Sequence, residues 1–175
     1  TEKDKVSIEH ILPQTPSKYY WQNQYRQFTD EEVEMLAGAL GNLLPLSQSV
    51  NSSLQNDSFY DKKTTKAGRR GYENGCHSEI EVAKYNDWTA ENIYTRSKKL
   101  LEFMENRWEF SFNSEQLDKL VYVNFAVDGR TVPEELPVPE SADESDNEEP
   151  SGEKFSEIKK YLESCGKSKI SLTFA

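Results

Sequence analysis

The amino-acid sequence predicts an α+β fold that is mostly helical, and three observations predict it. The segment from Val6 to Ile11 is short and apolar at alternate positions, which is the period of a β-strand. Residues 133–152 hold four prolines among acids and serines, a composition typical of a disordered linker. A long helix is expected after the capping residue Thr89, because apolar residues recur there at helical spacing, namely Ile93, Leu100, Leu101, Met104 and Trp108.

A further helix and a second strand are expected between the first strand and the long helix. Thr29 and Glu32 have the spacing of a capping box, which predicts a helix that ends at Gly41 in a positive-φ position. Residues 42–46 form an apolar run suited to a strand. A short helix is expected to begin at residues 47–49.

The C-terminal third predicts strands. Leu120 to Val127 has the composition of a strand, and Asp128-Gly129 is a hairpin-type turn, so a C-terminal β-hairpin is expected. Beyond the acidic linker, Phe155, Ile158 and Leu162 predict a short amphipathic helix, and residues 170–174 a short strand.

The formal net charge of -10 is concentrated in one part of the chain. Residues 111–150 carry 11 acidic and 2 basic residues, so the acidity describes the tail more than the rest. A binder of nucleic acid usually has a basic face, and the total charge counts against that function. A basic run after Asp57 offers a local exception or a solvated face, and it comprises Lys62, Lys63, Lys66, Arg69 and Arg70.

Cysteine spacing and hydropathy exclude several classes of protein. Cys76 and Cys165 lie far apart and neither belongs to a Cys-x-x-Cys pair, so a disulfide framework or a zinc knuckle is not expected. The sequence contains neither a signal peptide nor an apolar run of membrane-spanning length. A cytoplasmic protein is therefore expected.

The pair Glu9-His10 predicts hydrolytic chemistry. Cleavage of a phosphodiester needs a base for the attacking water and a cation that offsets charge on the phosphate. His10 can act as that base near neutral pH, and Glu9 can hold a hard divalent cation. Neighbouring residues of a strand point to opposite sides, so His10 can face the water and Glu9 the metal. Alone, the pair also fits a structural ion pair.

Two asparagine motifs supply the remaining parts of such a site. Asn42 lies in Leu-Gly-Asn-Leu, and Asn51 follows nine residues later in Val-Asn-Ser-Ser. The side-chain oxygen of Asn51 is expected to join Glu9 as a ligand of one Mg²⁺ or Mn²⁺ ion. Asn42 is expected to orient the catalytic base by bracing the loop around His10, although Gly-Asn is also a plain turn dipeptide.

These motifs occur in an order that resembles a known family. The ordered set resembles the HNH-type, or His-Me finger, nuclease domain at the C-terminus of GmrSD-like type IV restriction enzymes, over roughly residues 6–110. The motifs are Glu-His-Ile-Leu-Pro-Gln, Leu-Gly-Asn-Leu-Leu-Pro-Leu, Val-Asn-Ser-Ser-Leu, Phe-Tyr-Asp-Lys-Lys and, later, Trp88-x4-Ile93-x2-Arg96-x3-Leu100.

The resemblance implies a small ββα-metal core surrounded by helices, metal-dependent DNA cleavage and a role in defence against phage, often against modified bases. By position, His10 matches the general base, Asn42 the middle member of the HNH set and Asn51 its metal-binding final member. Glu9 stands where relatives place a further metal ligand. The resemblance places Lys63 and Arg96 near substrate phosphate, and Lys62 is assigned there from the basic run. It also implies a ParB-like nucleotide-hydrolysing module as partner.

Four segments are therefore expected along the chain. Residues 1–110 form the HNH-like nuclease domain, and residues 111–132 a strand and hairpin extension. Residues 133–152 form the acidic linker, and residues 153–175 the start of a further, truncated module. The chain is interpreted as a piece of a longer protein.

Two other functions fit the same sequence. A non-catalytic module that binds nucleic acid or docks a partner could retain the nuclease scaffold. An acidic protein-interaction domain or DNA mimic would explain the net charge. The catalytic hypothesis depends on residues 9, 10, 42 and 51 lying close together.

Overall fold

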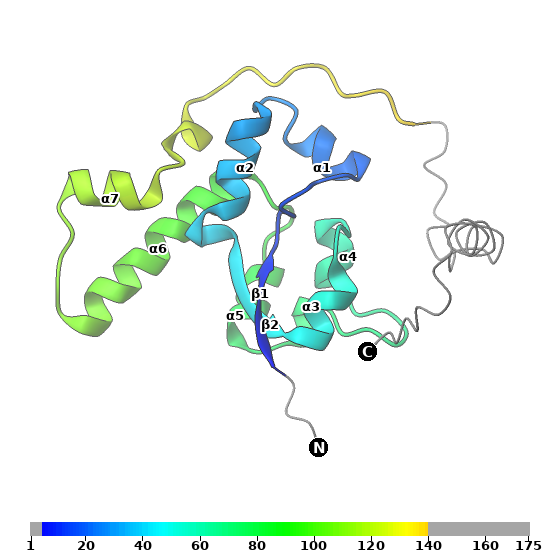
Figure 1. Ribbon diagram of the computed structural model, residues 1–175, viewed down its shortest axis with the longest axis horizontal. Helices are drawn as coiled ribbons and strands as arrows, with labels where there is room; N and C mark the ends of the chain where they lie inside the picture. Colours follow the sequence, from blue (N-terminus) through cyan, green and yellow to red (C-terminus); the bar gives the residue numbers. More distant parts are fainter. Residues whose placement is uncertain (1–4, 140–175) are drawn as a thin grey trace, which may run out of the picture. The chain divides into compact units, whose positions relative to one another are not determined.

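In the computed structural model, which describes residues 5–139, two strands pair near the centre and helices surround them (Figure 1). The strands are β1 (Val6–His10) and β2 (Leu43–Ser47). The α-helices are α1 (Tyr19–Gln24), α2 (Asp30–Gly38), α3 (Gln48–Leu54), α4 (Phe59–Lys63), α5 (His77–Ala83), α6 (Ala90–Trp108) and α7 (Ser114–Val121). Three 3-10 helices are η1 (Leu40–Asn42), η2 (Tyr72–Asn74) and η3 (Asn124–Val127). The α+β class is confirmed.

The strands form an antiparallel pair whose register places His10 opposite Leu43 and Glu9 opposite Leu44. Side chains alternate across the pair: Glu9 and Leu44 face the core, whereas Ile8 is half exposed. Helix α3 begins directly after β2 and contacts both strands. Helix α3 thus lies against the strand pair, and His10 is the last residue of β1.

Helix α2 begins as expected and ends earlier. Thr29 and Glu32 make both hydrogen bonds of the capping box. The helix ends at Gly38, and Gly41 lies instead in η1, so the prediction of a positive-φ cap at Gly41 is wrong. Glycine is needed at position 41 for close packing, because a Cβ there would lie 1.9 Å from the carbonyl oxygen of Ile93 in α6.

Helix α6 is the longest helix of the described residues and packs its first half on η1. Thr89 caps it through a capping box with Asn92, which confirms the expected start. Ile93 and Leu101 are buried, but Trp108 is 59% exposed, so the apolar stripe stops short of the last turn.

The predicted C-terminal β-hairpin is wrong. Residues 120–127 form the end of α7 and then η3, not a strand. Asn113 caps α7 through a capping box with Gln116, and Val121 packs into the core beside Val123. Gly129 has the positive φ of a turn, but within residues 5–139 no strand pairs beside it.

After η3 the chain runs extended over α2 and α1 (Figure 1). Arg130 makes a two-point ion pair with Glu32. Leu136 donates its amide to Asn23 and accepts from the hydroxyl of Tyr19, at 3.0 and 2.6 Å. The first residues of the expected linker are therefore bound to α1. The predictions for residues 140–175, namely the rest of the linker, a short helix and a short strand, lie outside the described residues.

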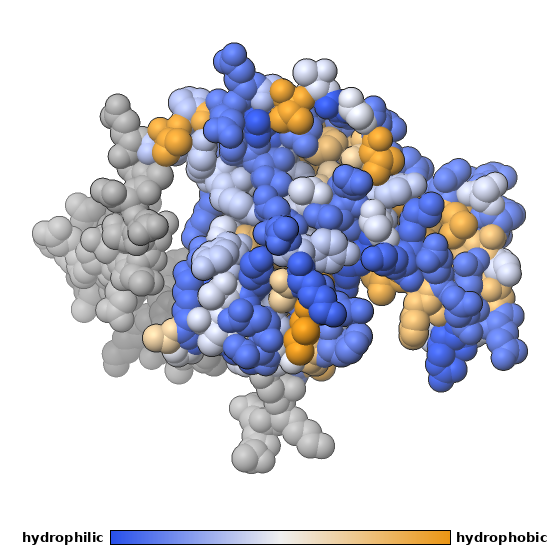
Figure 2. Space-filling model, turned by 180° about the vertical axis from the view of Figure 1, so that it is seen from behind, coloured by the Kyte–Doolittle hydropathy of each residue, from blue (hydrophilic) through white to orange (hydrophobic). Residues whose placement is uncertain are grey.

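The described residues include no helix that is long and apolar enough to cross a membrane. Figure 2 shows a largely hydrophilic surface on one face, with apolar side chains gathered over α6 and α7. Exposed apolar residues in those elements include Phe103, Trp108 and Leu120.

Candidate active site

The imidazole of His10 lies at the end of β1 and is partly buried. Burial lowers the pKa of His10 below its ordinary value; the carboxylate of Glu9 opposes this shift and the charge of Lys62 adds to it. The net direction favours the neutral ring at pH 7. A neutral imidazole can accept a proton, which is the property that a general base requires.

Glu9 forms an ion pair, and its partner is Lys62 rather than His10. Oε1 of Glu9 accepts hydrogen bonds from Nζ of Lys62 at 2.7 Å and from the hydroxyl of Tyr72 at 3.0 Å. Glu9 is 4% exposed and Lys62 is 0% exposed. Burial lowers the pKa of Lys62 although Glu9 opposes the shift, and burial and Glu9 together raise the pKa of Tyr72.

Asn42 is fully buried and satisfies both ends of its amide. Its Oδ1 accepts from the amide of Leu12 at 2.8 Å and from the indole of Trp88 at 3.0 Å. Its Nδ2 donates to the carbonyl oxygens of Leu12 and Ala37. Because the backbone oxygen of Asn42 also accepts from Ile11, this asparagine fixes the two residues that follow His10. This arrangement fits the bracing role expected from the sequence.

Asn51 reaches β1 from α3. Its Nδ2 donates to Oγ of Ser7 at 2.9 Å and to the carbonyl oxygen of Ile8 at 3.1 Å. The helix is therefore held against the strand one residue before Glu9. The Oδ1 atom of Asn51 accepts no hydrogen bond from residues 5–139.

The basic residues assigned to substrate phosphate have intramolecular partners. Lys62 is enclosed with Glu9, and Lys63 donates to the carbonyl oxygens of Tyr85 and Asn86. The other cations of the basic run are paired too: Lys66 with Asp61, Arg69 with Asp57, and Arg70 with Glu79. The run therefore does not form a free cationic face in this structure.

Arg96 clamps the turn that leads into β2. One guanidinium nitrogen donates to the carbonyl oxygens of Gly41 and Leu43, at 2.5 and 2.9 Å. Leu43 is the residue opposite His10 in the strand pair. Burial lowers the pKa of Arg96, but an arginine guanidinium is still charged at pH 7.

Two side-chain oxygens remain for a cation, Oε2 of Glu9 and Oδ1 of Asn51. Neither accepts a hydrogen bond from the described residues, and neither is among the enclosed atoms left without a partner. Residues 5–139 contain no group of three or more His, Cys, Asp and Glu side chains that could hold a metal. Carboxylate and amide oxygens are nevertheless donor types that Mg²⁺ accepts.

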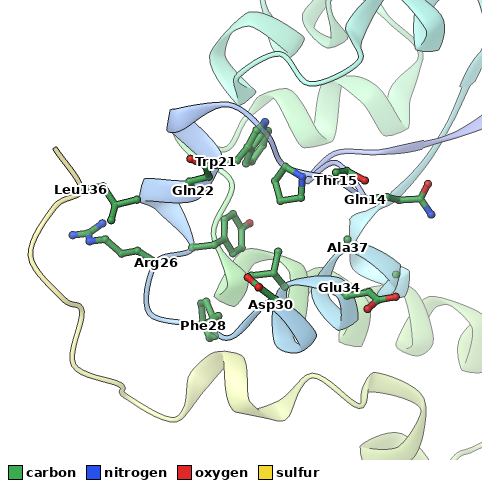
Figure 3. A pocket seen from close by; sticks show the side chains of 14 residues that line it. Gln14, Thr15, Trp21, Gln22, Arg26, Phe28, Asp30, Glu34, Ala37 and Leu136 are labelled. Carbon is green, nitrogen blue, oxygen red and sulfur yellow. The ribbon is translucent and has the colours of Figure 1, made fainter. Parts of the chain in front are cut away.

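A cavity of about 910 Å³ is lined mainly by α1, α2 and the residues around them (Figure 3). Its lining includes Gln14 and Thr15, which follow the His10 segment. It also includes Leu136 from the segment after η3, residues 128–139, which we call the strap. None of the candidate site residues lines it. Asp30 and Glu34 contribute negative charge there, which disfavours a phosphate ligand.

Two residues that hold the site were not predicted to do so. The hydroxyl of Tyr72 donates to Glu9, and the indole of Trp88 donates to Asn42. The need for them follows from burial, since a buried carboxylate or amide requires donors. The sequence carries no signal that identifies which donors they are.

Comparison with known protein families identifies the class of this protein. The chain belongs to a family of restriction endonuclease domains. The family is that of the C-terminal domain of GmrSD restriction endonucleases, whose sequence model matches residues 1–103. No curated protein and no solved structure matches the chain.

The family match covers the complete candidate site. Every site residue, from Glu9 to Arg96, lies within residues 1–103. The match ends inside α6, so α7, η3 and the strap over α1 lie outside it.

Proposed function

We propose that this chain is a divalent-cation-dependent DNA endonuclease domain of the HNH, or His-Me finger, type. The observation that carries the proposal is the contact of Asn51 with Ser7 and Ile8, which joins the helix to the strand that bears Glu9 and His10. This contact supports a ββα arrangement in which the two ligand oxygens lie near the base. The family of restriction endonuclease domains supports the reaction class.

In the proposed reaction, neutral His10 accepts a proton from a water molecule. The water oxygen attacks phosphorus, the bond from phosphorus to the leaving oxygen breaks, and that oxygen takes a proton from solvent. Asn42 keeps the segment after His10 in place through Ile11 and Leu12. A bound Mg²⁺ or Mn²⁺ at Glu9 and Asn51 would offset negative charge on the phosphate.

The proposed biological role is restriction of phage or foreign DNA, including DNA with modified bases. A ParB-like nucleotide-hydrolysing module is the proposed partner, in the same protein or complex. Lys63 and Arg96 are the proposed phosphate contacts, and Arg96 is the better placed because it is bound to the residue facing His10. Lys62 is excluded from this role by its enclosure.

The test is a plasmid-nicking assay with Mg²⁺, with Mn²⁺ and with EDTA, on modified and unmodified DNA. Cleavage with either metal and none with EDTA is expected. Calorimetry with Mn²⁺ adds an independent readout: Asn51→Ala should weaken binding, and Ser52→Ala, an exposed neighbour on α3, should not. A chain that binds DNA without binding Mn²⁺ or cutting would be a non-catalytic module instead.

A further inference from the structure

The ammonium group of Lys62 is bound by three consecutive residues. It donates to Oε1 of Glu9 at 2.7 Å, to the carbonyl oxygen of His10 at 3.2 Å and to that of Ile11 at 3.1 Å. An ammonium has three N–H donors, so these acceptors use all of them. With a 0% exposed side chain, Lys62 has no donor left for DNA.

The acceptors of Lys62 span the candidate base. His10 is the last residue of β1, and the chain leaves the strand at Ile11. Asn42 holds Ile11 and Leu12 through their backbone amides, while Lys62 holds the carbonyl oxygens of His10 and Ile11. Two buried residues, Lys62 and Asn42, therefore hold the carbonyl group of His10 and the backbone of the two residues that follow it.

Tyr72 completes this arrangement. Its hydroxyl and the Lys62 ammonium both bind Oε1 of Glu9, at 3.0 and 2.7 Å. Both donors thus share one oxygen of the carboxylate, and Oε2 has no donor among residues 5–139. Lys62 and Tyr72 come from α4 and η2, elements that contact each other.

We propose that Lys62 and Tyr72 are positioning residues for the nuclease reaction: together they fix the backbone that carries His10 and turn one carboxylate oxygen of Glu9 outward. This inference rests on the proposed function. A purely structural role would not require all three acceptors of Lys62 to belong to residues 9, 10 and 11. Stability alone also does not explain the ion pair, because apolar groups can often replace a buried ion pair without loss of stability.

The substitution Lys62→Met tests the proposal in the full chain, with Lys119→Met on α7 as the control for loss of one exposed positive charge. Three quantities are measured: kcat for plasmid cleavage, Kd for DNA with its salt dependence, and hydrogen exchange at the amides of Ile11 and Leu12. We expect kcat to fall about 10²-fold, because small displacements of a catalytic group have effects of that size. Kd and its salt dependence should be unchanged, and exchange at both amides should be faster.

Two results would overturn the proposal. The first is a folded Lys62→Met chain with wild-type kcat or wild-type exchange at Ile11 and Leu12. The second is weaker DNA binding with a salt slope reduced by about one, which is the signature of a lost phosphate contact.

Because Lys62→Met leaves Glu9 without its cation and can fail to fold, Tyr72→Phe serves as the second variant. The control is Tyr122→Phe, which removes an exposed hydroxyl bound to the carbonyl oxygen of Met35. Tyr72→Phe should lower kcat about 10-fold at constant Kd, within the range known for groups that orient catalytic residues; an unchanged kcat contradicts the proposal. A wild-type chain that cleaves no DNA refutes the proposed function, and the exchange measurement then still decides whether Lys62 holds residues 10 and 11.

Discussion

Asn42 shows how much one side chain contributes at the scale of the residue. It connects η1 to the segment after His10 and to Trp88, and all of its polar atoms are used. Removing it leaves several buried donors and acceptors without partners, each of which has a desolvation cost. The same amide thus serves stability and the position of the segment that follows His10, the proposed base.

Asn42→Ala should lower the free energy of unfolding by about 3 kcal/mol, as expected for loss of a fully buried polar network. Denaturant titration gives the value. Asn106→Ala is the matched control, because that side chain is exposed and binds only its own helix, and its effect should stay within about 0.5 kcal/mol. A loss below about 1 kcal/mol for Asn42→Ala would show that the network is unimportant.

The pH dependence of cleavage follows from the lowered pKa of His10. A general base works in its neutral form, which predominates above its pKa. The midpoint of the decline in rate at acid pH should therefore lie below 6.5, the ordinary value for histidine. A profile of kcat/KM against pH measures this, and a midpoint above 6.5 would contradict it.

The contacts of Asn42 with the segment after His10 were foreseeable from the sequence, whereas the burial of Lys62 beside Glu9 was not. A motif indicates which atoms are close along the chain, and Glu9, His10, Asn42 and Asn51 all belong to such motifs. Lys62 was assigned to DNA because it belongs to the basic run after Asp57. Its burial depends on α4 packing beside β1, which local sequence does not specify.

At the scale of the element, the junction of η1 with α6 positions the start of β2. Oγ of Ser97 accepts a hydrogen bond from the amide of Gly41 at 2.8 Å, and Arg96 donates to the carbonyl oxygen of Gly41. This close approach is possible only because Gly41 lacks a side chain. Helix α6 therefore supports the strand pair through its contacts with Gly41 and Leu43.

Gly41→Ala should destabilise the fold by about 3 kcal/mol, because the added Cβ would lie 1.9 Å from a backbone oxygen of α6. Gly38→Ala is the control: its Cβ would meet the hydroxyl of Tyr122 at an ordinary 3.5 Å. Thermal unfolding of both variants compares them. Equal melting temperatures would contradict the described contact between η1 and α6.

Capping boxes made the starts of α2 and α6 predictable, because their hydrogen bonds are local. The end of α2 and the whole of α7 were not predictable in the same way. The apolar residues from Leu120 to Val127 suit a strand, yet a strand needs a partner, and within residues 5–139 none is beside them. Val121 and Val123 pack into the core, and this packing favours helical structure over a strand.

At the scale of the whole molecule, charge and fold must be considered together. The chain is acidic overall, with a formal net charge of -10, and many of its cations are bound internally, for example Lys62, Arg69 and Arg70. Such a chain has little general affinity for DNA. Binding would then rely on a few contacts near the site or on a partner module.

The central claim is that residues of β1 and α3 cleave DNA, and His10→Ala tests it most directly. The measurement is the single-turnover rate of plasmid cleavage with Mn²⁺, at protein concentrations that saturate the DNA. The rate should fall by about 10²–10⁴-fold relative to the wild-type chain, while Kd for DNA and the melting temperature remain the same. A folded His10→Ala chain that cleaves at the wild-type rate would contradict the account.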